Sequence, residues 1–326
     1  MKSRKNGFFI LLLTLLFLCL PLGACGSGDR PVLADSAQDP PQTDERELSR
    51  GSVAEASGVR SSTPVVLTGS ADGTVTYGNA SVTIDASHTA DGYLMISYTG
   101  SNPKVKLQIT GEDETTYTYN LHGGYETFPL TSGNGTYRIG IFENIEGTSY
   151  STLFTQDLVA DISNEFGPYL YANQYVNFTA DSATVAKGAE LAASASDDLA
   201  VIECVYNYII TNFTYDYDKA ANVESGYLPD VDTILASGTG ICFDYAAVMA
   251  AMLRTQRIPT RLEVGYVGDV YHAWISTYIH GQGWINGIIH FDGNTWELMD
   301  PTFASTSSSP KNFLTDRSDY LTKYVY

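Results

Sequence analysis

The chain has 326 residues and a formal net charge of −19; 44% of its residues are hydrophobic and 17% are charged. This length and composition are typical of well-packed globular protein with room for two domains, and they exclude a largely disordered chain. The negative charge excludes binding to nucleic acid through phosphate contacts and binding to membranes through a basic surface.

The first 24 residues have the pattern of an export signal. A basic start at residues 1–5 precedes the apolar run Phe8–Leu20, which is too short for a typical membrane-spanning helix. The run is followed by LGAC at 22–25, which resembles the lipobox of bacterial lipoproteins, where a peptidase cuts before the cysteine and the cysteine receives lipid. This resemblance implies a mature chain that begins at Cys25 and is anchored by lipid to the cell membrane, on its extracellular or periplasmic face. A plain secretory signal or an uncleaved anchor is the alternative.

The composition changes at about residue 62. Residues 25–61 are rich in Gly, Ser, Pro and Asp and poor in apolar residues, which predicts a flexible tether. Residues 62–160 contain short runs of alternating apolar and polar residues between turn signals, which predicts an all-β sandwich domain. We expect His88 and His122 to be exposed or capping residues, and the domain to be a spacer or a binding module. The predicted strands are 74–78, 81–85, 93–99, 104–110, 115–121, 136–142 and 150–158.

After a predicted linker at 161–181, the pattern becomes helical and then returns to a period of two. Apolar residues at i, i+3, i+4 and i+7 predict a helix at 199–213, capped near Ser196, and a short helix at 182–193 precedes it. Residues 182–326 therefore form a second domain of helices packed on an antiparallel sheet, and the fold class is α+β. In order, we expect an acidic loop at 214–232, a helix that begins near Cys242, and strands at 260–267, 270–279, 284–291 and 295–299.

Four cysteines are present, and only Cys204 and Cys242 remain in the folded protein if Cys25 carries lipid and Cys19 leaves with the signal. Cys204 lies among apolar residues of the predicted helix, so we expect it to be buried and inert. A disulfide between Cys204 and Cys242 is the structural alternative outside the cell. The spacing of the cysteines matches no zinc site, and we expect neither a metal nor a cofactor.

Cys242 has the position of a nucleophile. Gly238 and Gly240 precede it and allow a tight turn and a close approach of substrate. The N-terminus of a helix presents unpaired N–H groups and a partial positive charge, which favour thiolate over thiol.

A thiolate nucleophile needs a base and an orienting group. His272 is the best base, because it lies in the middle of a predicted strand between aromatic residues, whereas His280 and His290 are near turns. Asp300 ends the last predicted strand before Pro301, and on a neighbouring antiparallel strand it could reach His272. By itself, Asp300 is better explained as a turn residue before proline.

The order Cys242, His272, Asp300 on helix, strand and strand resembles the transglutaminase-like superfamily, which shares its core with papain-like cysteine proteases. The resemblance covers about residues 180–305. In that family a glycine-preceded Cys, a His in an H-A-W context and an Asp in a D-P-T context form the catalytic triad. The matching stretches are ASGTGICFDYAAVMAAMLRTQRIPTRLEVGY at 236–266, YHAWISTYI at 271–279 and TWELMDPTF at 295–303.

The resemblance implies a surface-anchored cysteine acyl-transfer enzyme with catalytic Cys242, His272 and Asp300, which hydrolyses peptide or protein amide bonds through a thioester. The substrate is then a peptide or protein. Two alternatives remain open: protein cross-linking of the transglutaminase type, and a non-catalytic cell-surface binding protein that retains the fold. Backbone N–H groups at the start of the Cys242 helix are the expected oxyanion donors.

Overall fold

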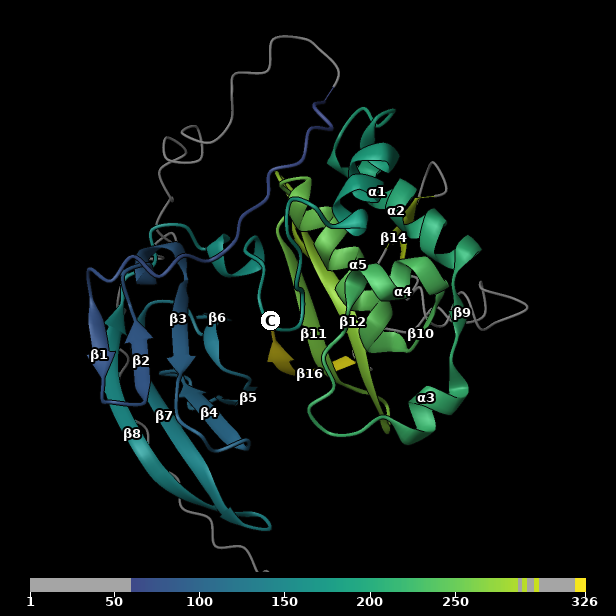
Figure 1. The fold of residues 1–326 in the computed structure, drawn as a ribbon. Helices are drawn as coiled ribbons and strands as arrows, with labels where there is room; N and C mark the ends of the chain where they lie inside the picture. The colour runs from purple at the N-terminus through teal and green to yellow at the C-terminus, as the bar shows by residue number, and fades with distance from the viewer. Residues whose placement is uncertain (1–59, 287–288, 292–295, 299–319) are drawn as a thin grey trace, which may run out of the picture. The chain divides into compact units, whose positions relative to one another are not determined.

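The computed structural model describes residues 60–286, 289–291, 296–298 and 320–326, which belong to one compact unit, Ser57–Tyr326 (Figure 1). The expected signal peptide, the lipid-bearing Cys25 and the triad residue Asp300 lie outside the described residues. Within the described part of the chain, no helix is both long and apolar enough to span a membrane.

The N-terminal half of the described chain consists of two antiparallel sheets, as expected. Their strand orders are β1-β2-β3-β6 and β5-β4-β7-β8. Alternation determines which residues enter the core: in β4 the side chains alternate between buried and half-buried positions, because successive residues of a strand face opposite sides. The strands are β1 (Thr76–Gly78), β2 (Val82–Asp85), β3 (Tyr93–Tyr98), β4 (Val105–Thr110), β5 (Thr116–Leu121), β6 (Gly124–Pro129), β7 (Gly135–Glu146) and β8 (Ser149–Ala160).

Strand β6 was not predicted from the sequence. This strand begins at Gly124, ends at Pro129 and has exposed or half-buried side chains over its first four residues, so it lacks a local strand signal. Pairing with β3, whose residues are all buried, is what makes this segment a strand.

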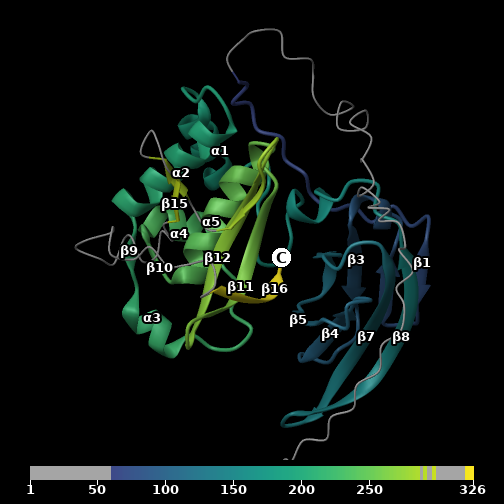
Figure 2. The ribbon, with the colours of Figure 1, turned by 180° about the vertical axis from the view of Figure 1, so that it is seen from behind.

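Helices dominate the second half up to residue 255. Helix α5 is buried from Asp244 to Thr255 and packs against β11 (Thr260–Val267) and β12 (Val270–Ile279), with α1, α2 and α4 around it (Figures 1 and 2). Asp197 caps α2, because its side chain accepts a hydrogen bond from the Ala200 N–H at 2.9 Å. The helices are α1 (Ala183–Ala192), α2 (Asp198–Asn212), α3 (Tyr217–Asn222), α4 (Val231–Ser237) and α5 (Cys242–Thr255).

The segment 214–232 is more ordered than the acidic loop that we expected. It contains α3, the start of α4 and the short strand β9 (Thr214–Tyr215), which pairs in parallel with β10 (Thr239–Gly240). Two of its acidic residues are helix caps: Asp216 accepts from the Lys219 N–H and Asp230 from the Thr233 N–H. Helices this short contain too few turns for a periodic apolar pattern, so only the capping residues could have revealed them.

The sheet under α5 has the order β13-β12-β11-β16 among the described residues, and its pairs are antiparallel. The predicted strand 284–291 is divided into β13 (Gly283–Asn286) and β14 (Ile289–Phe291), and β14 pairs with β15 (Trp296–Leu298). The strand β16 (Tyr320–Val325) was not predicted. The fold class, α+β with antiparallel sheets followed by helices packed on a further sheet, is confirmed.

Aromatic contacts join the two N-terminal sheets to the sheet that packs under α5. Tyr117 and Tyr119 of β5 lie edge-on to Tyr326, with ring centroids 5.5 Å and 6.0 Å apart. The connecting segment 161–181, which we expected to be a linker, contributes Val176 and Phe178 to the same buried cluster. The described residues therefore share one continuous core.

Candidate active site

Cys242 is the first residue of α5 and is half-buried. The preceding residue, Ile241, is the N-cap and has extended backbone, so the chain turns into the helix immediately before the sulfur-bearing residue. Both Cys204 and Cys242 are free thiols, which removes the disulfide alternative.

Two glycines shape the approach to Cys242, each for its own reason. Gly238 ends α4 with a φ of 59°, in the left-handed region where residues with a Cβ are strained. A Cβ on Gly240 would lie 2.6 Å from the Cβ of Asp244, so only glycine leaves room for the Asp244 side chain. The loop before Cys242 thus requires both glycines, as the sequence suggested.

Asp244, two residues after Cys242, is fully buried and was not singled out from the sequence. Its carboxylate accepts hydrogen bonds from the Ile241 N–H at 2.8 Å, the Tyr227 hydroxyl at 2.7 Å and the Lys219 ammonium at 2.6 Å. The Lys219 ammonium also lies 4.3 Å from the centre of the Tyr227 ring. A buried carboxylate needs such partners because an unpaired charge is costly in a protein interior.

This Asp244 cluster, formed by Asp244, Lys219 and Tyr227, fixes the start of the Cys242 helix to the segment that contains α3. One signal in the sequence could have revealed its centre: an acidic residue three positions after an N-cap reaches back to the N-cap N–H in a capping box. Lys219 and Tyr227 carry no local signal, because their role depends on a carboxylate far along the chain.

Tyr215 lies beside Cys242. Burial raises the pKa of the Tyr215 hydroxyl to about 12, the nearby Cys242 sulfur adds to this rise, and a hydrogen bond with the Cys242 backbone opposes it. At neutral pH the hydroxyl therefore keeps its proton and can donate it to an acceptor near the sulfur.

His272 is 5% exposed and lies in β12, opposite Gly265 of β11. Its ring stacks on that of Trp274, with ring centroids 6.2 Å apart. The rival His280 is exposed, and His290 is in β14.

Asp300 lies outside the described residues. The preceding strand, β15, pairs with β14 and not with β12, whose described partners are β11 and β13. The role of Asp300 as the group that orients His272 therefore stays a prediction.

Cys204 differs from Cys242 in its surroundings. It lies in α2 and is half-buried rather than fully buried, next to the exposed Glu203 at the edge of the apolar face of the helix. Burial, and after it the charge of Glu203, raises the pKa of the Cys204 thiol. This favours the neutral thiol, in line with an inert residue.

Among the described residues, no group of three or more His, Cys, Asp or Glu side chains is arranged to hold a metal ion.

The segment that contains Cys242 and His272 has a match among known families. Residues 185–287 match the family model described as transglutaminase-like superfamily. This segment is a transglutaminase-like superfamily domain. The domain includes α5 and β12, and Asp300 lies beyond the matched residues.

The chain is also similar to several solved structures. A Cytophaga hutchinsonii protein described as a candidate cysteine protease is 12% identical, covers 77% of this chain and 73% of its own, and has a TM-score of 0.37. The periplasmic domain of TgpA from Pseudomonas aeruginosa is 13% identical, and the match covers 74% of this chain and 100% of the TgpA domain, with a TM-score of 0.34. Red sea bream transglutaminase is 15% identical, and the match covers 66% of this chain and 48% of the transglutaminase, with a TM-score of 0.28. These TM-scores are too low to support a further argument, and no curated protein matches the chain.

Proposed function

We propose that the chain is a cysteine acyl-transfer enzyme that hydrolyses peptide or protein amide bonds, with Cys242 as nucleophile, His272 as base and Asp300 as the residue that orients His272. One observation carries the proposal. Within a transglutaminase-like domain, a half-buried free cysteine begins a helix that packs directly on the strand of a buried histidine.

The proposed reaction has two steps. The Cys242 thiolate attacks the amide carbonyl carbon, the C–N bond breaks, and His272 gives its proton to the leaving amine. Water then loses a proton to His272 and attacks the thioester carbonyl; the C–S bond breaks, and the acid and the free thiolate result. The protonated Tyr215 hydroxyl is a suitable hydrogen-bond donor to the oxyanion of each tetrahedral intermediate.

Iodoacetamide is expected to modify Cys242 faster than Cys204 at neutral pH. The raised pKa of Cys204 leaves little thiolate there, so its alkylation should begin only at a pH above that of an ordinary free thiol. His272→Ala should slow the alkylation of Cys242, because it removes the proposed partner of the thiolate, and should leave Cys204 unchanged. Mass spectrometry of the two cysteine peptides across a pH series measures both rates. Equal rates at the two cysteines, or no effect of His272→Ala, would contradict the proposed pair.

The acyl acceptor is tested separately. Incubation with peptide amides and a fluorescent primary amine distinguishes hydrolysis, which releases a free acid, from cross-linking, which attaches the amine. We expect the free acid to predominate. A predominance of the attached amine would assign the chain to protein cross-linking instead.

We also propose that Cys25 carries a lipid that anchors the enzyme to the cell membrane. Cys25→Ala is expected to leave an unprocessed precursor or to release soluble protein, because the thiol that receives the lipid is absent. Fractionation of cells and mass measurement of the mature N-terminus check this, with Cys19→Ala as the matched control. Unchanged processing and membrane retention in Cys25→Ala would rule out the lipid anchor.

A further inference from the structure

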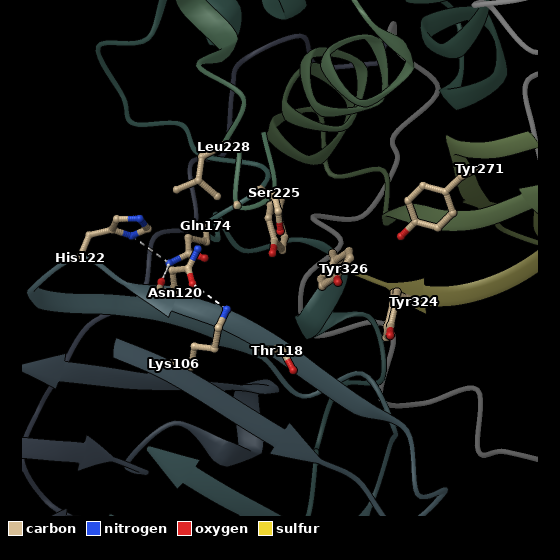
Figure 3. A pocket seen from close by; sticks show the side chains of 12 residues that line it. Lys106, Thr118, Asn120, His122, Gln174, Ser225, Leu228, Tyr271, Tyr324 and Tyr326 are labelled. Carbon is tan, nitrogen blue, oxygen red and sulfur yellow. Dashed lines mark hydrogen bonds between the residues drawn. The ribbon is translucent and has the colours of Figure 1, made fainter. Parts of the chain in front are cut away.

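A pocket of about 260 Å³ lies between β5, the segment 225–228 and the aromatic residues of β12 and β16 (Figure 3). Asn120 and Gln174 line one side, and Tyr271 and Tyr326 line another. Figure 3 shows Lys106 beside Asn120, Leu228 above Gln174, and Ser225 between Gln174 and Tyr326. The proposed enzymatic reaction leaves this pocket without a role.

Gln174 presents an unused acceptor in this region. Its amide nitrogen donates to the Asn120 carbonyl oxygen at 2.7 Å and to the Glu126 carboxylate, which determines the direction of the amide group. Its Oε1 atom is buried and has no hydrogen-bond partner among the described residues. An unsatisfied buried acceptor costs free energy. A small rotation of the Gln174 side chain, which lines the pocket, would expose this atom to a ligand that supplies an N–H or O–H donor.

Lys106 presents unused donors close by. Its ammonium donates to the Asn120 side-chain oxygen, a neutral partner, at 3.2 Å, and its two remaining protons can serve further acceptors. Gln174 and Lys106 thus both bond to Asn120, one through its backbone and the other through its side chain. A ligand beside Asn120 can therefore donate a hydrogen bond to Gln174 and accept one from Lys106.

Tyrosine rings supply much of the remaining wall. Tyr175 and Tyr326 contact each other with centroids 4.6 Å apart, and Tyr324 and Tyr271 lie farther along the same side. Their ring faces offer apolar contact, and their hydroxyl groups both donate and accept hydrogen bonds.

Gly226 brings the segment 225–228 close to the sandwich. Its φ is 89°, and a Cβ at this position would lie 2.4 Å from the Asn120 side-chain nitrogen. The pocket therefore depends on a glycine at the place where this segment meets β5.

We propose that this pocket binds a saccharide unit of a glycan. Each sugar hydroxyl both donates and accepts, so neighbouring hydroxyls satisfy the Gln174 Oε1 atom and the Lys106 ammonium together. The apolar C–H faces of a sugar ring can stack on the tyrosine rings. The pocket volume of about 260 Å³ suits one sugar ring rather than an extended peptide. The lining residues include no carboxylate, and the neighbouring Glu126 carboxylate is already bonded to Gln174 and His122.

The pocket adjoins the proposed active site. Phe243, which follows Cys242, packs on Tyr175 with centroids 5.4 Å apart. Tyr271, which lines the pocket, immediately precedes the proposed base His272 in β12. If the proposed function holds, a glycan bound here would present an attached peptide to Cys242.

The test measures saccharide binding to the full chain, purified in detergent, and requires no catalysis. Saturation-transfer NMR and titration calorimetry use chitotriose, cellotriose and maltotriose, with a mixture of unmodified tripeptides as the competing class. At least one saccharide is expected to bind. Lys106→Met and Gln174→Met should each weaken its binding by about tenfold or more, since each removes a hydrogen bond.

Lys104→Met is the matched control, because Lys104 is exposed, lies near Lys106 in the chain and does not line the pocket. Thermal unfolding shows that each variant is folded, and Thr118→Val, a change of nearly constant shape at the pocket wall, provides a second test if Gln174→Met is unstable. Binding of tripeptides but not saccharides would overturn the proposal, as would saccharide binding that Lys106→Met and Thr118→Val leave unchanged. Cys242→Ala should bind saccharide normally, so failure of the proposed reaction and failure of this inference are distinguishable.

Discussion

Cys242→Ala is expected to lower the rate of amide hydrolysis by about 10⁴-fold or more, because loss of a nucleophile from a catalytic triad abolishes the covalent route. His272→Ala should have a similar effect, and the double variant should be little slower than either single one, since the residues act as a unit. The measurement is the turnover of peptide amides by wild-type and variant chains.

Cys204→Ala is the matched control for this comparison, because Cys204 is also a half-buried helix cysteine. It should retain wild-type turnover. Equal turnover in Cys242→Ala and wild type would remove Cys242 from the mechanism and favour a binding protein that keeps the fold.

Asp244→Ala is expected to lower the free energy of unfolding by about 3 kcal/mol, as is typical when one partner of a buried ion pair is removed. The change leaves the Lys219 ammonium without its carboxylate and the Ile241 N–H without its acceptor. Urea denaturation measures the loss. The same variant should lower turnover, because the Ile241 N–H immediately precedes the nucleophile.

Asp218→Ala is the control for the Asp244 prediction. It removes the same formal charge from an exposed position in α3, so we expect a change of less than about 0.5 kcal/mol. Combining Lys219→Met with Asp244→Asn should cost less than the sum of the two single changes, since the two residues interact directly. Equal effects of Asp244→Ala and Asp218→Ala would show that the Asp244 cluster does not stabilise the protein.

Elements with a strong local pattern were predicted well. The alternating residues of β4, the repeated apolar positions of α2 and the paired strands β11 and β12 all agree with the structure to within one or two residues. The start of α5 at Cys242 was also anticipated, because glycines before an apolar helical run are a local signal. The predictions failed for β6, α3 and β16, which are short or polar and depend on distant partners.

The sequence by itself determined the α+β class, the helix that begins at Cys242 and the strand that carries His272, because each follows from the period of neighbouring side chains. Only the tertiary structure decided which distant groups meet. Lys219 and Tyr227 reach Asp244 through a fold that buries the carboxylate, and β16 reaches β11 from far along the chain. Gln174 acquires its unpartnered acceptor in the same way. Such contacts depend on the packing of whole layers, and local propensity contains no information about them.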